Sequence, residues 1–184
     1  VHAGVDHPAT RPPHLVGQAT EVLVEILVDP GLERGEIPML GPPGPVKDES
    51  LPAGDRAFAV TAVSMGNPHS LLQVDDIGDD RIPAIGAWLD AHEAFPDRVN
   101  AGFAQVLDRQ RIRLRVVERG PGETLACGSG ACAAVAILAR WGLVGDSVDV
   151  FLPGGRLVIQ WPGAEGPVLM KGPAQHVFRG KMDE

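Results

Sequence analysis

Cysteine is scarce in this sequence, and the common metal-binding motifs built on cysteine or histidine are missing. The 184 residues contain two cysteines, Cys127 and Cys132, which are too few for a disulfide framework. Both lie on one predicted helix, on different faces of it, so a bond between them would distort the helix. Neither a Cys-x-x-Cys nor a His-Glu-x-x-His motif is present. We therefore expect no metal, and a reducing, cytoplasmic location.

Long apolar runs and an excess of basic residues are missing as well. No run reaches the about 20 residues that a membrane-spanning helix needs, and no signal-peptide pattern is visible. The sequence has 16 Lys and Arg against 24 Asp and Glu, a formal net charge of −8. Because binding to nucleic-acid phosphates requires a basic surface, we expect neither nucleic acid nor membrane as a partner.

The most informative stretch spans residues 118–142, where a glycine-rich loop leads into a helix. The loop contains Glu118 and Arg119, and its glycines allow backbone N–H groups to approach a ligand closely. The spacing predicts a helix over 128–141, with Gly142 as its C-terminal cap. Cys127 then lies at the helix N-terminus, beside unpaired N–H groups and the positive end of the helix dipole. That position predicts a lowered thiol pKa.

The same helix has no polar face. Residues 131–139 are all Ala, Cys, Val, Ile or Leu, and a helix that is apolar on every side is a buried helix. An inert core helix with a packed cysteine would explain the thiol alone. The surrounding loop residues favour instead a site that holds a carboxylate at the helix N-terminus.

These residues closely match one known family. The run Glu-Arg-Gly-Pro-Gly-Glu-Thr-Leu-Ala-Cys-Gly-Ser-Gly-Ala-Cys at 118–132 resembles the second catalytic-cysteine motif of diaminopimelate epimerase. The resemblance implies that Cys127 is catalytic, and that Glu118, Arg119, Gly128 and Ser129 bind the substrate. It extends over about residues 56–181 and is looser over 19–56.

Two further motifs fit the resemblance. Gly-Asn-Pro-His at 66–69 is typical of a tight turn between strands, and in the resembled family it supplies substrate contacts, which implies that Asn67 and His69 bind substrate. Arg-Val-Asn-Ala-Gly-Phe at 98–103 places Asn100 at a strand entry. Alone it would be a turn residue, and the resemblance implies that it is a ligand.

The chain pattern indicates a mixed α/β (α+β) protein. We expect residues 33–53, which are rich in proline, to form a connecting loop with one short extended piece near 37–40. Apolar alternation and helical periodicity predict a helix over 81–92 with Ile82, Ile85, Leu89 and Trp88 facing inward, and a series of strands. The expected strands are 19–28, 56–64, 70–74, 101–107, 111–119, 147–152, 156–161, 168–171 and 176–179.

The resemblance also implies the architecture, which is one half of the diaminopimelate-epimerase fold: a curved, barrel-like mixed sheet wrapped around a central buried helix. We expect residues 1–27 to be a remnant of an N-terminal half or a flexible segment, and 28–172 to be the C-terminal epimerase-like domain. Residues 173–184 would be a strand that packs on the N-terminal half. An uncovered sheet edge there would favour a homodimer or other association through that edge.

The implied reaction is inversion at an amino-acid α-carbon without pyridoxal phosphate or any other cofactor, on diaminopimelate, in lysine and peptidoglycan-precursor biosynthesis. Such a reaction needs an acid and a base on opposite faces of the α-carbon and fixed donors for the carboxylate. The family's other catalytic cysteine stands in a Cys-Gly-Asn-Gly motif, which this sequence does not contain. We therefore expect a chain that corresponds to the C-terminal two-thirds of the enzyme, with one of two catalytic cysteines, and inactive alone.

Two alternatives stay open on the sequence. The chain could be a complete, divergent isomerase similar to proline racemase or the phenazine-pathway isomerases, although the Glu-Thr-x-Ala-Cys-Gly run favours the epimerase branch. It could also be a non-catalytic module that keeps the anion pocket without one of the bases.

Overall fold

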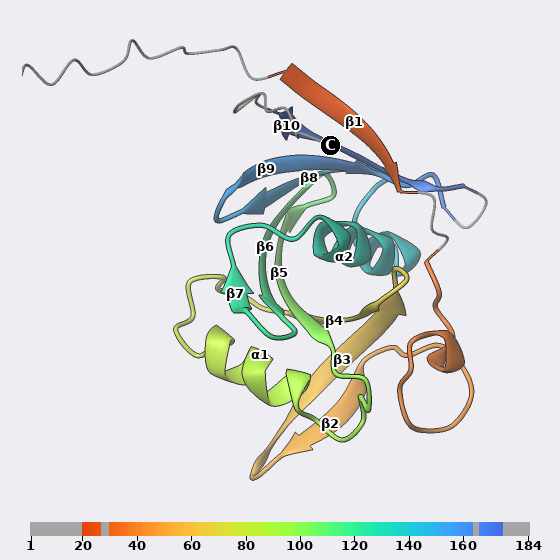
Figure 1. The fold of residues 1–184 in the computed structure, drawn as a ribbon, viewed down its shortest axis with the longest axis vertical. Coiled ribbons are helices and arrows are strands. Elements are labelled where there is room, and N and C mark those ends of the chain that lie inside the picture. The colour runs from red at the N-terminus through yellow and green to blue at the C-terminus, as the bar shows by residue number, and fades with distance from the viewer. Residues whose placement is uncertain (1–19, 27–29, 164–165, 175–184) are drawn as a thin grey trace, which may run out of the picture.

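The computed structural model describes residues 20–26, 30–163 and 166–174, the first of these ranges for its backbone. The predicted strand over 176–179 and most of the segment 1–27 lie outside the described residues. The elements, shown in Figure 1, are β1 Thr20–Ile26, η1 Arg34–Glu36, β2 Glu49–Ala53, β3 Arg56–Ser64, β4 Pro68–Gln73, α1 Ile82–Asp90, β5 Asn100–Asp108, β6 Arg111–Glu118, β7 Gly122–Thr124, α2 Gly128–Arg140, β8 Ser147–Leu152, β9 Gly155–Gln160 and β10 Val168–Ala174.

The strands of the described residues form one mixed, curved sheet. Its order is β1-β10-β9-β8-β6-β5-β4-β3-β2, and β7 pairs with β6 beside this path. The pairs β4–β5 and β6–β8 are parallel, and the other pairs are antiparallel. Each parallel pair is joined by a connection that contains a helix, α1 in the first case and α2 in the second, as parallel neighbours require.

Helix α2 lies inside the curve of the sheet (Figure 1). It contacts β3, β4, β5, β6, β9 and β10, and every residue from Gly130 to Leu138 is buried. Small side chains such as Ala133 and Ala136 allow the surrounding strands to approach closely. The prediction of a curved sheet around a central buried helix is confirmed, and so is the glycine cap, because Gly142 has a φ of 73°.

The sheet buries apolar side chains on both faces. On the concave face Ile112, Leu114 and Val116 of β6 pack around α2, as their alternation predicted. On the convex face Val117 and Phe103 join a second cluster. Helix α1 covers this outer face and contacts β5, β6 and β7. Its inward residues are those expected, since Ile82 and Leu89 are buried and Ile85 and Trp88 pack against the cluster.

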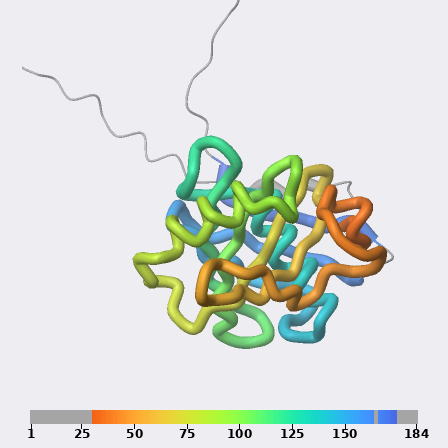
Figure 2. Tube along the Cα trace, turned by 90° about the horizontal axis from the view of Figure 1, so that it is seen from below, coloured from red at the N-terminus to blue at the C-terminus, as the bar shows by residue number. Residues whose placement is uncertain are grey.

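The proline-rich segment differs from the prediction. Residues 33–53 contain the short helix η1 and the strand β2 instead of a loop with an extended piece near 37–40. β2 forms because it pairs antiparallel with β3, with Leu51 opposite Phe58. It occupies the end of the sheet path, where a strand tolerates a proline such as Pro52. Figure 2 shows the loop around η1 at the side of the molecule opposite α1.

The strand predicted over 168–171 is longer in the structure. β10 extends to Ala174 because its final residues pair with β1, with Gly172 opposite Val22 and Ala174 opposite Thr20. β7 was not predicted, because Gly122–Thr124 lies in the expected glycine-rich loop and forms a strand by pairing with the end of β6. The other strands, α1 and α2 agree with the predicted elements to within a few residues. The domain boundaries at 27/28 and 172/173 stay predictions.

Candidate active site

Cys127 lies where the sequence predicted, at the N-cap of α2. Its backbone is extended, with φ −135° and ψ 107°, and Gly128 is the first helical residue. Cys127 is 6% exposed, and its Sγ atom lies 3.7 Å from the Ser129 hydroxyl oxygen. A Cβ at position 130 would lie 3.1 Å from Sγ. Glycine at that position therefore allows the close approach of the helix to the sulfur.

The first backbone N–H groups of α2 have no acceptor within the helix. In the part of the chain that the structure describes, the first helical N–H with a backbone acceptor is that of Ala131, which donates to the Cys127 carbonyl at 2.9 Å. Gly128 is tightly placed as well, since a Cβ there would lie 3.1 Å from Sδ of Met170 on β10. The N–H groups of Gly128 and Ser129 thus belong to the open first turn of α2 and are suited to an anion, whereas the backbone of Gly130 forms a hydrogen bond with the thiol.

The expected lowering of the Cys127 pKa is wrong. Burial raises the pKa of the thiol, and the carboxylate of Glu118 raises it further. Hydrogen bonds from the Ser129 hydroxyl and the Gly130 backbone act in the opposite direction. Desolvation disfavours the charged thiolate more than the helix-terminal donors stabilise it.

His69 and Asn67 form one pair within the site. The His69 ring Nε2 lies 3.1 Å from Oδ1 of Asn67, at the point where the turn after β3 becomes β4. His69 is 2% exposed. Burial, followed by the nearby Arg119 cation, lowers its pKa to about 4. The imidazole is therefore neutral near pH 7, and it donates to the Asn67 oxygen through an Nε2–H.

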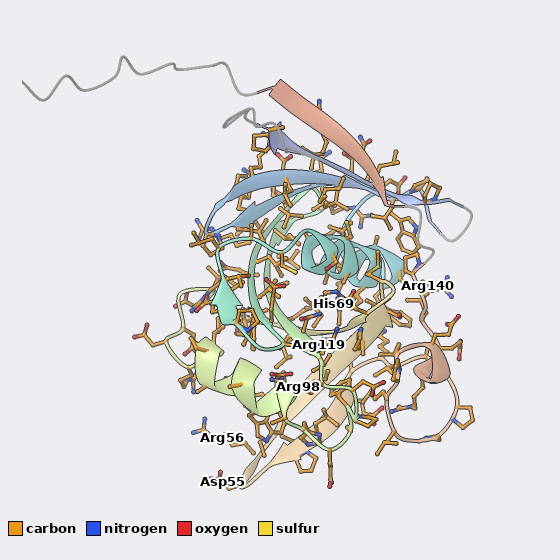
Figure 3. All side chains as sticks on the ribbon, in the orientation of Figure 1. Asp55, Arg56, His69, Arg98, Arg119 and Arg140 are labelled. Atoms are coloured by element: carbon orange, nitrogen blue, oxygen red, sulfur yellow. The ribbon has the colours of Figure 1, made fainter. Side chains whose placement is uncertain are left out.

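Asn100 connects three segments. Its Oδ1 accepts the backbone N–H of Arg119 at 3.1 Å, and its Nδ2 donates to the Pro68 carbonyl at 3.3 Å. In the parallel β4–β5 pair, Asn100 stands opposite His69. The Arg119 guanidinium donates to the Asp97 carbonyl at 2.9 Å. Figure 3 shows His69 and Arg119 in the region between α2 and α1.

Glu118 ends β6 and is half-buried. Its carboxylate accepts a hydrogen bond from the Thr124 hydroxyl at 2.6 Å, and it is close enough to the Cys127 thiol to raise the pKa of that group. The hairpin β6–β7 makes this contact possible, because Glu118 stands opposite Gly122.

Contacts in the structure join the predicted site residues in groups: His69 with Asn67, Asn100 with Arg119, and Glu118 and Ser129 with Cys127 at the start of α2. They come from four places along the chain, the turn before β4, the start of β5, the end of β6 and the start of α2, and they are Asn67, His69, Asn100, Glu118, Arg119, Cys127, Gly128 and Ser129. Sequence reasoning missed Thr124 and the Asp97 carbonyl. Thr124 stood inside the quoted motif, and its hydroxyl, six residues after Glu118, was the available signal. No sequence signal marks the Asp97 carbonyl, because every residue has a backbone carbonyl.

Among the described residues, no three His, Cys, Asp or Glu side chains gather closely enough to hold a metal ion. Within the same ranges, no helix is both long and apolar enough to cross a membrane.

Comparison with solved structures defines the class of fold. The chain is similar to a probable proline racemase from Agrobacterium radiobacter K84, at a TM-score of 0.56 and 16% identity, over 86% of this chain and 54% of the other. It is similar also to a hydroxyproline epimerase from Agrobacterium vitis, at a TM-score of 0.53 and 18% identity, over 69% and 46%. The fold is therefore that of racemases and epimerases of this kind.

Sequence comparison defines the family within that class. The family model for diaminopimelate epimerase matches residues 61–177, and the chain belongs to this family. It is 48% identical over 171 residues to a diaminopimelate epimerase from Desulforudis audaxviator (strain MP104C). The aligned residues cover 93% of this chain and 62% of the relative. The chain thus spans less than two-thirds of the length of that relative.

Proposed function

We propose that the chain carries one proton-transfer half of a diaminopimelate epimerase site, of the kind that converts LL- to meso-diaminopimelate in lysine biosynthesis. The observation that carries this proposal is the position of the Cys127 thiol. It lies at the N-terminus of a buried helix, between the N–H donors of that helix and the Glu118 carboxylate.

The helix terminus would hold the α-carboxylate of the substrate. The N–H groups of Gly128 and Ser129 point out of the first turn, and the helix dipole adds positive potential there. Donors fixed in this way stabilise the charge that develops on the carboxylate when the α-proton leaves. The Ser129 hydroxyl, 3.7 Å from Sγ, is near enough to assist the thiol itself.

Glu118 would pair with the substrate's α-ammonium group. In the free protein its negative charge raises the pKa of Cys127. Pairing with a cation offsets this charge, so substrate binding would lower the pKa of the thiol toward the range in which it exchanges protons. Cys127 would then act as a thiol acid in one direction and as a thiolate base in the other.

We propose the cytoplasm as the location and expect no cofactor.

The remaining polar side chains would hold and shape the rest of the site. We assign Arg119, Asn67 and Asn100 to the polar groups at the distal end of the substrate. His69, neutral and bonded to Asn67, would orient that amide and leave proton transfer to the thiol. Cys132 is buried completely inside α2, so we expect the second proton-transfer group outside the described residues.

A non-catalytic anion-binding module is the second candidate. The raised pKa of Cys127 favours it, because a protonated, buried thiol is a weak base. Such a module would bind the same carboxylate at the terminus of α2 without exchanging the α-proton.

One experiment separates the two candidates. The chain is incubated with LL-diaminopimelate in D2O under reducing conditions, and the α-proton is followed by NMR, with Cys127→Ser as the matched variant. In parallel, the ligand is tested for protection of Cys127 against iodoacetamide, read by peptide mass spectrometry. Deuterium uptake that depends on Cys127 supports proton transfer. Saturable protection without uptake supports the binding module, and absence of both contradicts the proposed function.

A further inference from the structure

Asp90 and Arg98 form an ion pair at the connection between α1 and β5. Asp90 is the last residue of α1, and its Oδ2 accepts from the Arg98 guanidinium. The Asp90 side chain is 9% exposed, and its Oδ1 is buried without a hydrogen-bond partner among the described residues. A buried carboxylate is unfavourable unless a cation stays beside it. Arg98 is thus tied to this position.

The backbone of Arg98 is also constrained. Its φ is 63°, in the left-handed region that residues other than glycine seldom adopt. The Arg98 N–H donates to the Phe95 carbonyl at 2.9 Å. A chain segment keeps such a conformation when its surroundings hold it, and the ion pair to Asp90 acts here together with that backbone hydrogen bond.

The residues on either side of Arg98 hold Arg119. Asp97 supplies the carbonyl that accepts from the Arg119 guanidinium, and Asn100 supplies the oxygen that accepts from its backbone N–H. The same loop therefore anchors both ends of one site residue. Figure 3 shows Arg98 at the end of α1, with Arg119 and then His69 lying from there toward α2.

We propose that the Asp90–Arg98 ion pair fixes the loop of residues 95–100 and thereby positions Arg119 in the candidate active site. Arg98 and Asp90 are positioning residues that act through Asp97 and Asn100. The importance of Arg119 for substrate rests on the proposed function, whereas its placement can be measured without any activity.

His69 reports the placement of Arg119. Arg119, and not Arg98, is the cation that lowers the His69 pKa. If the loop moves, Arg119 loses its two anchors and its charge moves relative to the imidazole. The His69 pKa then rises, even in a protein that stays folded.

The test compares Arg98→Met with Arg98→Lys. Both substitutes are unbranched and share the backbone cost of a left-handed φ, but only lysine keeps the charge beside Asp90. The His69 pKa is measured by ¹⁵N-resolved NMR titration of the ring, assigned by the signal that His69→Gln removes. Arg119→Met gives the shift for complete loss of the cation, and Arg111→Met, which disrupts an exposed ion pair with Asp108, is the control.

We expect Arg98→Met to produce at least half of the Arg119→Met shift, Arg98→Lys a small fraction of it, and Arg111→Met none. An unchanged His69 pKa in folded Arg98→Met would overturn the proposal, as would equal shifts for methionine and lysine. If Arg98→Met does not fold, Asp90→Asn takes its place, because it keeps a hydrogen-bond acceptor for Arg98 and removes the charge. In Asp90→Asn, an upward shift of the His69 pKa that is smaller than the Arg119→Met shift supports the proposal, and an unchanged His69 pKa overturns it.

The same variants distinguish this inference from the proposed function. If the His69 pKa shifts in a chain that neither exchanges nor binds diaminopimelate, the result supports the positioning role of Asp90 and Arg98 and contradicts the proposed epimerase function. In a chain that does exchange the α-proton, Arg98→Met should raise KM more than it lowers kcat, because Arg119 is assigned to binding.

Discussion

The backbone N–H of Gly154 donates a hydrogen bond to the Leu125 carbonyl oxygen at 2.7 Å. Gly154 lies in the turn between β8 and β9, and Leu125 lies two residues before Cys127 in the loop that leads into α2. A Cβ on Gly154 would lie 2.9 Å from the Leu125 carbonyl oxygen and 3.2 Å from its Cβ. The hairpin can therefore support the loop at this distance because position 154 carries no side chain.

Gly154→Ala should displace the loop that carries Cys127. The added methyl group has no space beside the Leu125 backbone, and we expect a loss of about 1–3 kcal/mol in the free energy of unfolding, typical of overpacking. The rate of Cys127 alkylation should change with it. Urea denaturation and mass spectrometry measure the two effects. Gly145→Ala is the control, because the nearest atom to its Cβ, the Arg109 carbonyl oxygen, lies 3.5 Å away. Equal denaturation midpoints for the two variants would contradict this account.

Glu118→Gln should lower the pKa of Cys127. The Glu118 carboxylate disfavours the thiolate, and the neutral amide of glutamine removes this repulsion. At a fixed pH between 7 and 8, iodoacetamide should then alkylate Cys127 faster in Glu118→Gln than in the parent chain. Both pH profiles are read by peptide mass spectrometry. Cys132→Ala is the control and should leave the profile of position 127 unchanged, because burial raises the Cys132 pKa to about 12. A slower reaction in Glu118→Gln would show that the carboxylate activates the thiol instead.

Stability should decrease in acid because of His69. Its pKa is about 4 in the folded chain and about 6.5 in an unfolded one. Between these values the unfolded state binds a proton that the folded state does not, so folding loses up to about 3 kcal/mol as the pH falls from 6.5 to 4. His69→Gln should remove this part of the pH dependence. Urea denaturation at several pH values gives the free energy of unfolding of the parent chain and of His69→Gln as a function of pH. The difference between the two curves should be constant between pH 7 and 8. Parallel curves through the acid range would contradict the prediction.

Gly86→Ala should destabilise the contact between α1 and β6. Alanine favours a helix by up to about 1 kcal/mol over glycine, but a Cβ at position 86 would lie 2.4 Å from a methyl carbon of Val117. We expect the clash to exceed the gain in helix propensity, with a net loss of about 1–2 kcal/mol. In the background Val117→Ala the loss should be smaller, because the two methyl carbons of Val117 are gone, but it should not vanish, because the Cβ of residue 117 stays 2.5 Å from the added Cβ. A double-mutant cycle by urea denaturation measures this coupling, and additive effects would show that the two positions do not contact.

The elements near the thiol were predictable because their signals are local. The apolar run after Cys127 indicated a buried helix, and the alternation of Ile112, Leu114 and Val116 indicated a half-buried strand. The glycine at position 142 has the left-handed φ of 73° that a helix C-terminus favours. Each signal involves residues within a few positions of one another, and backbone sterics and burial act at that range.

The proline-rich segment was not predictable in the same way. β2 contains a proline and has one buried side chain, Leu51. Its extended backbone is stabilised by pairing with β3, and pairing is a property of two segments together. The outer core has the same origin, because Phe103 and Val117 share one buried cluster with residues of α1 and of the segment around η1.

The sequence proposed the candidate residues of the site, and the tertiary structure decided their contacts. A motif of fifteen residues was enough to place Cys127 at the start of a helix and to name its neighbours. It could not give the pKa of the thiol, because burial by distant strands decides between a thiol and a thiolate. Nor could it show that Asn100 holds Arg119. That contact depends on β5 and β6 pairing in one register, and local sequence carries no information on which segments will meet.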